Sequence, residues 1–116
     1  MKPRGAAVYI QDILTAIGKI EKYTEGMSLK TFREKEETFD AVVRNIEIIG
    51  EAVKRIPESV TSKYPHIAWR DAAGMRDVLI HDYPDIAIDI VWDTAKEHLP
   101  ILKEQMREVK RDLENK

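Results

Sequence analysis

The chain has 116 residues, 19 of them Lys or Arg and 21 Asp or Glu, which gives a formal net charge of −2 at neutral pH. This length fits a single folded domain over 1–116, and the acidic balance excludes a protein that coats nucleic acid through a general surplus of cations. The lack of cysteine excludes disulfides and Cys-ligated zinc, and no run approaches the ~18 apolar residues of a membrane span. We therefore expect a soluble, cytoplasmic protein that does not enter a membrane.

The first half of the chain predicts two long helices joined by a short one. Apolar residues recur at helical spacing over about 6–25, and Gly26 offers a stop after them. Ser28 is the expected N-cap of a short helical turn, and the charged run 33–37 is interpreted as a solvated junction. The next apolar stripe predicts the second long helix over about 37–56.

The second half predicts two more helices and a tail. A third helix is expected over about 68–82, and Asp85 or Asp89 is the expected cap of a fourth. Pro100 should kink that helix or mark a joint, because proline removes one backbone donor. The charged tail 103–116 is either a frayed helix or a helix that needs a partner. The fold class is therefore all-α, a four-helix up-and-down bundle with short extra helical turns.

The second long helix carries more apolar surface than one stripe. Ile48 points away from the main stripe, in line with Ala41 and Ala52. Such a second, weaker strip is available to another copy of the chain, so we expect a homodimer.

One stretch gathers chemically versatile side chains: Arg76, Asp77, His81 and Tyr83, followed by Pro84. Arginine is a permanent cation that binds phosphate through two parallel hydrogen bonds, and histidine gains or loses a proton near neutral pH. Together these groups can bind a phosphate and move a proton beside it. The alternative is structural, because a lone Arg and His near a helix end are often surface charges that interact with the helix dipole.

Helical spacing decides how these side chains can cooperate. Asp77 and His81 are four residues apart, so the carboxylate can bind one imidazole nitrogen and fix the tautomer. Arg76 and His81 lie about 140° apart on a straight helix. One chain can aim both at one phosphate only if the helix ends near His81, which Pro84 favours. Otherwise a second protomer must supply one of the two groups across a two-fold axis.

The run from Arg76 to Tyr83 resembles the Arg-x4-His-x-Tyr motif of the HepT-like toxins, small helical ribonucleases of the HEPN superfamily. The resemblance covers about 6–108 and is more specific than the motif alone. Three further segments are similar to the second-helix signature of the family, the lead-in to its catalytic helix and its last helix: 44–52, 69–75, and 90–93 with Leu99-Pro100.

This resemblance implies a metal-independent RNA endonuclease that acts as the toxin of a type VII toxin–antitoxin pair, with Arg76 and His81 as catalytic residues. The implied partner is an MntA-like nucleotidyltransferase that silences the toxin by transferring AMP to Tyr83. Asp77 fits the motif as a supporting residue. The segment 84–86 departs from the family, in which an aromatic residue and Gly are frequent, so the local loop shape differs.

Two polar residues of the second helix, Asn45 and Glu51, are candidates for orienting Arg76, although a polar bundle surface is the simpler interpretation. The three His residues are far apart in sequence and predict no metal site, and nothing predicts a cofactor. Two alternatives to the ribonuclease remain open: a non-catalytic helical binding partner of a minimal nucleotidyltransferase, and a dimeric scaffold in which the motif is structural.

Overall fold

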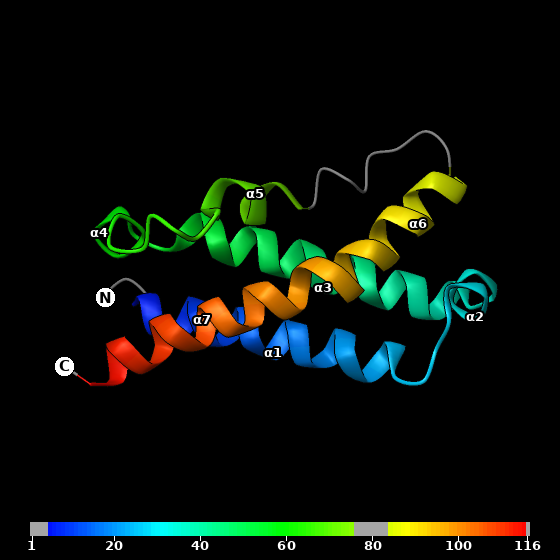
Figure 1. Cartoon of the computed structure of the whole chain (residues 1–116), viewed down its shortest axis with the longest axis horizontal. Coiled ribbons are helices and arrows are strands. Elements are labelled where there is room, and N and C mark those ends of the chain that lie inside the picture. The colour runs from blue at the N-terminus through cyan, green and yellow to red at the C-terminus, as the bar shows by residue number, and fades with distance from the viewer. Residues whose placement is uncertain (1–4, 76–83, 116) are drawn as a thin grey trace.

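The computed structural model describes residues 5–75 and 84–115, and every regular element within these ranges is helical. Three long helical segments lie side by side, with short helices between them (Figure 1). This arrangement confirms the predicted all-α bundle. Within the described ranges, no helix combines the length and the apolar character that crossing a membrane requires.

The first helix, α1 (Ala6–Thr24), ends as the sequence predicts. Gly26 follows with a φ of 73°, a left-handed conformation that a residue without Cβ adopts without strain. Ser28 then caps the short helix α2 (Leu29–Glu34), because its hydroxyl accepts a hydrogen bond from the Thr31 backbone N–H at 3.2 Å. The predicted stop and cap are therefore both confirmed.

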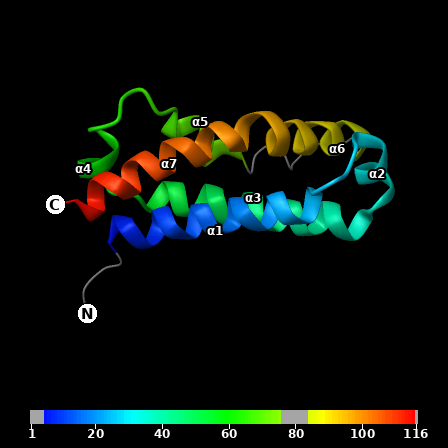
Figure 2. The same ribbon diagram turned by 60° about the horizontal axis from the view of Figure 1, so that its bottom comes forward.

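The second long helix, α3 (Glu36–Arg55), begins directly after Lys35. Acidic residues occupy its first turn and basic residues its last turn, an order that suits the positive and negative ends of the helix dipole. Its apolar stripe packs against α1 and includes Val42, Ile46 and Ile49, each fully buried. The pairing of α1 with α3 forms one half of the bundle (Figure 2).

The connection after α3 consists of α4 (Glu58–Thr61), a loop, and α5 (Trp69–Ala73). The third helix predicted over 68–82 is shorter than expected in its described part. Regular α geometry ends at Ala73, and Gly74 and Met75 form a tighter 3₁₀ turn. Glycine is among the poorest helix formers, which makes Gly74 a natural place for this change. The remaining predicted residues, 76–82, lie outside the described ranges.

The last segment of the bundle is one rod made of α6 (Pro84–Asp93), a π-helical turn η2 (Thr94–His98), and α7 (Leu99–Glu114). Pro100 stands in the first turn of α7, so the predicted joint is confirmed. Its ring nitrogen cannot donate to the carbonyl four residues earlier, and a wider turn, in which the Leu99 N–H donates to the Thr94 carbonyl, directly precedes it. The predicted caps were wrong, because α6 begins at Pro84 and both Asp85 and Asp89 lie inside it.

The charged tail packs within its own chain. Met106 and Val109 are fully buried in α7, which runs beside α1 (Figure 2). The sequence analysis left two alternatives for this tail, a frayed helix or a helix that needs a partner. Its apolar residues are instead part of the bundle core. In chain order α1 runs in one direction, α3 runs back in the opposite direction, and the rod of α6, η2 and α7 also runs opposite to α1 (Figure 1).

Candidate functional site

The motif residues Arg76, Asp77, His81 and Tyr83 lie outside the residues that the structure describes. Their described flanks do define where the segment is attached. It leaves from the 3₁₀ turn after α5 and returns at the start of α6, and both of these helices pack against α3. The motif is therefore anchored at both ends to one long helix.

The flank before the motif is fixed by a ring nitrogen and a buried methyl group. The Trp69 indole nitrogen donates to the Tyr64 backbone carbonyl at 3.1 Å, and Ala72 is buried in the core. Trp69 therefore packs and anchors the loop, as an indole with one apolar body and one polar atom commonly does.

The flank after the motif is fixed by aromatic packing. Phe32 of α2 is fully buried, with its ring centroid 5.1 Å from that of Trp92 in α6 and 6.0 Å from that of Phe39 in α3. On the surface above this cluster, the Arg33 guanidinium donates twice to one Asp89 oxygen, at 2.6 and 3.2 Å. Both charged side chains are half exposed, so the rings provide most of the attachment.

The two predicted supporting residues occupy different faces of α3. Asn45 is buried, and its amide donates to the Ala41 carbonyl at 2.9 Å within the same helix. Glu51 is half buried and lies about 120° around the helix from Asn45. Two side chains so far apart cannot both approach one group from the same side. A role for either in orienting Arg76 stays a prediction.

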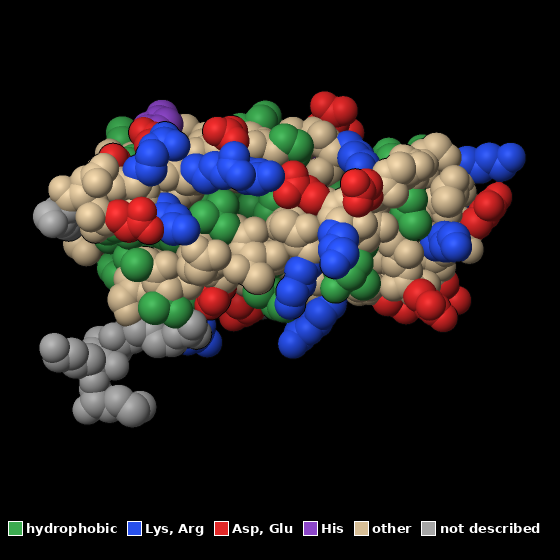
Figure 3. Space-filling view, turned by 90° about the horizontal axis from the view of Figure 1, so that it is seen from below, with side chains coloured by type: hydrophobic (Ala, Val, Ile, Leu, Met, Phe, Trp, Pro, Cys, Tyr) green, Lys and Arg blue, Asp and Glu red, His purple; other side chains and the backbone are tan. Residues whose placement is uncertain are grey.

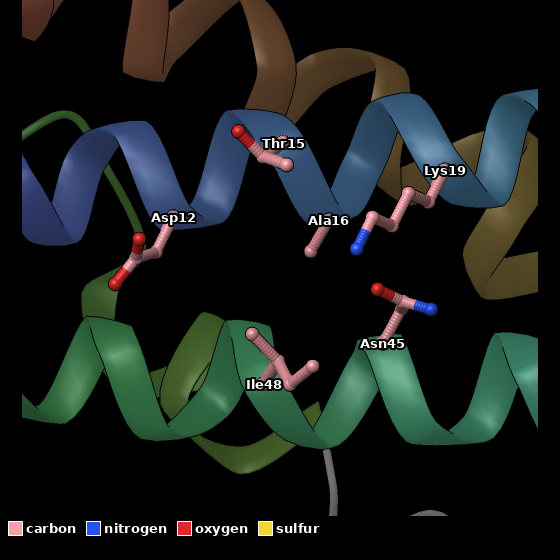
Figure 4. A pocket seen from close by; sticks show the side chains of 6 residues that line it. All are labelled: Asp12, Thr15, Ala16, Lys19, Asn45 and Ile48. Carbon is pink, nitrogen blue, oxygen red and sulfur yellow. The ribbon is translucent and has the colours of Figure 1, made fainter.

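Asn45 does line a groove with residues of α1. The groove has a volume of about 180 Å³ and is bounded by six side chains (Figure 4), namely Asp12, Thr15, Ala16, Lys19, Asn45 and Ile48. The sequence analysis did not single out the α1 residues among them. The signal was present, because Asp12, Thr15 and Lys19 are spaced by three and four residues and so share one polar helix face.

The apolar strip predicted for dimer formation is mostly used within the chain. Ala52 is only 5% exposed in the core, and Ile48 packs against that core at the edge of the groove. This leaves less apolar surface on α3 for another copy than the sequence suggested. Homodimerisation therefore stays a prediction.

The side chain of Lys96 attaches the carboxyl end of α1 to the last rod. The Lys96 ammonium of η2 donates to the Thr24 carbonyl at 3.4 Å and to its hydroxyl at 3.2 Å, and it lies 4.9 Å from the Trp92 ring centroid. The Thr24 hydroxyl in turn donates to the Ile20 carbonyl at 2.9 Å. A positive charge at the carboxyl end of α1 is favourable for the helix dipole, so the π-helical turn binds α1 to the last rod.

Two further polar contacts attach the loop before α5 to α7. The Tyr64 hydroxyl donates to Asp112 Oδ2 at 2.7 Å, and His66 Nε2 lies 2.9 Å from Glu108 Oε1. The hydrogen bond to the Asp112 carboxylate, together with burial, raises the pKa of Tyr64 to about 12. These groups lie at the opposite end of α7 from the π-helical turn and serve to fasten the loop.

We expect the Tyr64→Phe variant to unfold about 1–2 kcal/mol more easily at pH 8, because it loses a hydrogen bond to a charged group. The folded-state pKa is raised above that of the unfolded chain, so this contribution is fully present below about pH 10 and is lost as the pH rises through about 12. Urea unfolding between pH 8 and 11.5 measures this trend. Tyr23→Phe, at an exposed ring, is the matched control. A constant difference across that pH range would contradict the assignment.

No three His, Asp or Glu side chains gather within 5–75 and 84–115 as a metal centre would require. The motif carboxylate and imidazole lie outside that range, so this statement covers the scaffold alone. The scaffold thus offers one polar groove, the fixed flanks of the motif and two fastening contacts to α7.

Comparison with known proteins identifies the class to which this helical scaffold and motif belong. A family model described as "Ribonuclease HepT-like" matches residues 13–109. The chain is 40% identical over its whole length to a "Putative RNase" of Methanocaldococcus jannaschii, all of which is covered. It is also 40% identical, over 89% of its length, to 94% of a "Probable ribonuclease HepT" of Thermococcus cleftensis. No solved structure matches the chain.

The chain belongs to the HepT-like ribonuclease family. A second relative in Methanocaldococcus jannaschii, also described as a putative RNase, is 40% identical over the whole chain and 96% of its own length. The family that the motif pointed to is therefore confirmed across nearly the entire sequence.

Proposed function

We propose that this protein is a metal-independent RNA endonuclease in which Arg76 and His81 carry out the reaction. The observation that carries the proposal is the intact Arg-x4-His-x-Tyr sequence inside a chain that matches the HepT-like ribonuclease model over 13–109. The names of the relatives, which describe RNases, support the same substrate class. Cleavage by a single acid–base pair is consistent with the chemistry of RNA.

RNA supplies its own nucleophile, the 2′-hydroxyl, so a general base suffices to start cleavage. The His81 imidazole takes the proton from this hydroxyl or gives one to the leaving 5′-oxygen, both of which require a pKa near neutrality. Arg76 holds the phosphate through two parallel hydrogen bonds and stabilises the negative charge that grows on it. Asp77, one helical turn from His81, fixes the imidazole tautomer.

The site is composed of two copies of the chain. Arg76 and His81 are separated by about 140° on a regular helix, so a partner subunit that presents its own motif across a two-fold axis completes the arrangement. The two imidazoles then divide the roles of base and acid. Asn45 and Glu51 are candidates for orienting Arg76, since they lie on the helix to which both motif flanks are attached.

The activity is regulated as in a type VII toxin–antitoxin pair, in the cytoplasm. An MntA-like nucleotidyltransferase is the proposed partner and transfers AMP to the Tyr83 hydroxyl. Tyr83 lies two positions after His81, so the modification adds bulk and negative charge close to where the RNA phosphate must bind. Repulsion between the two phosphates then prevents substrate binding.

Purified protein is expected to cut RNA in the presence of EDTA and to leave ends that carry a 2′,3′-cyclic phosphate, while DNA of the same sequence stays intact. The reason is that the nucleophile belongs to the RNA and no metal is needed to generate it. Gel electrophoresis with end analysis measures both outcomes. Loss of cleavage in EDTA would overturn the scheme, and loss of all RNA cleavage would favour a non-catalytic partner of the nucleotidyltransferase.

A further inference from the structure

The groove between α1 and α3 combines a cation, polar side chains and an apolar floor. Ala16 and Ile48 supply apolar surface, while Thr15, Lys19 and Asn45 supply hydrogen-bonding groups (Figure 4). Ligand sites commonly combine mostly apolar walls with a few convergent polar groups. Four of the six residues that line this groove are polar, so it offers more hydrogen-bonding and charged groups than apolar wall.

Lys19 gives the groove its charge. Lys19 is exposed and, among the residues that the structure describes, its ammonium has no hydrogen bond or ion pair, as is also true of other surface lysines such as Lys63. In Figure 4 its side chain reaches over the groove toward Asn45. An unpaired ammonium beside an apolar floor attracts an anion that also has an apolar part.

The opposite end of the groove is negative. Asp12 lies seven residues before Lys19, roughly 10 Å along the helix axis, and its carboxylate stands at the other end in Figure 4. The Asn45 carbonyl oxygen lies close to the Lys19 ammonium, at the same end of the groove (Figure 4). A ligand thus meets a cation and an amide oxygen at one end, apolar surface in the middle and a carboxylate at the other end.

We propose that this groove binds one nucleotide of a single-stranded RNA, with Lys19 on a backbone phosphate and the base on Ile48 near the acceptors. A nucleotide matches the order of groups, since its phosphate is anionic, its base has an apolar face, and its base edge carries N–H donors. The inference deepens the proposed ribonuclease function and rests on it. The groove lies on α3, the helix against which both described flanks of the motif pack.

The size and charge of this face favour a single strand. A volume of about 180 Å³ equals roughly six water molecules, which accommodates part of one nucleotide. Seen from below, the molecule has Lys and Arg side chains interspersed with Asp and Glu (Figure 3). Without a continuous basic surface, binding here depends on the few groups of the groove.

The test compares Lys19→Met with Lys63→Met, both in the full-length His81→Ala protein, in which we expect RNA cleavage to be slow. Lys63 is exposed in the loop after α4 and gives the same change in net charge away from the groove. Binding of a short fluorescent single-stranded RNA is measured by anisotropy at several salt concentrations. We expect Lys19→Met to weaken binding about five- to tenfold and to reduce the salt slope by about 0.7, the value for one phosphate contact on a single strand.

Lys63→Met should bind within about twofold of the parent, and Lys19→Arg should restore most of the affinity because it keeps the charge. Circular dichroism melting confirms that each variant is folded. Equal affinities of the two Met variants would overturn the inference while leaving the cleavage result of the unsubstituted protein untouched. A Lys19→Met change in self-association without a change in RNA affinity would also overturn it and assign the groove to a second copy.

Discussion

Replacing His81 by alanine is expected to lower the rate of RNA cleavage by about 10²–10⁴-fold, the usual contribution of one general acid or base. The imidazole is the one group in the motif that can exchange a proton near neutral pH, so no neighbour substitutes for it. The cleavage rate under single-turnover conditions is the quantity to measure, because it separates the chemical step from RNA binding.

The two other histidines provide matched controls. His66 and His98 are both exposed, and each lies near a carboxylate, Glu108 and Asp93 respectively. Their alanine variants should cleave RNA at nearly the original rate. Cleavage that persists in the His81→Ala protein at the same rate as in these controls would remove His81 from the mechanism and leave the motif a structural role.

Truncating Phe32 to alanine is expected to lower the free energy of unfolding by about 3–5 kcal/mol, the usual cost of removing a buried aromatic ring. Phe32 is completely buried and contacts rings from both α3 and α6. The cavity would thus open at the point where α2, α3 and α6 meet. Urea unfolding followed by circular dichroism gives the difference.

Ile101→Ala is the control for Phe32→Ala, because this side chain is 59% exposed and its truncation should change stability by less than about 0.5 kcal/mol. Phe32→Leu should fall between the two, since leucine refills part of the cavity. A Phe32→Ala protein as stable as Ile101→Ala would mean that the ring cluster does not hold α6 in place.

Local sequence signals were sufficient for the helices whose ends depend on one residue. Gly26 stops α1 through its positive φ, and Ser28 caps α2 through its hydroxyl, both as predicted. These outcomes depend on the backbone of a few neighbouring residues and on no distant contact. The joint at Pro100 could also be predicted locally, because any proline lacks the backbone N–H that a regular helix requires.

Features that depend on contacts between residues far apart in the sequence could not be predicted from local sequence patterns. The tail has few apolar residues, so its sequence alone did not predict that Met106 and Val109 would be buried. The helix α7 packs against α1, which lies far away in the sequence. Asp89 was expected to cap a helix because Asp favours caps, yet it pairs with Arg33, 56 residues away. Regular α-helix ends before Gly74 because glycine is a weak helix former, whereas the apolar spacing alone predicted that the helix would continue through it.

The candidate site divides in the same way. The family motif with Arg76, His81 and Tyr83 can be recognised in one short stretch of sequence, and the family comparison agrees with it. The groove becomes visible only when Lys19 of α1 and Asn45 of α3 are brought together across the helix pair. Its residues are 26 positions apart, so no local spacing rule joins them.

The π-helical turn explains how the last rod keeps one face toward the core. Buried residues recur at every fourth position through Ala87, Val91, Ala95 and Leu99. On a uniform α-helix, each such step would advance the buried face by about 40°, a drift of about 120° over three steps. The wider turn at Thr94–His98 cancels most of this rotation. One irregular turn therefore sets how α6 is rotated about the axis of the rod relative to α7.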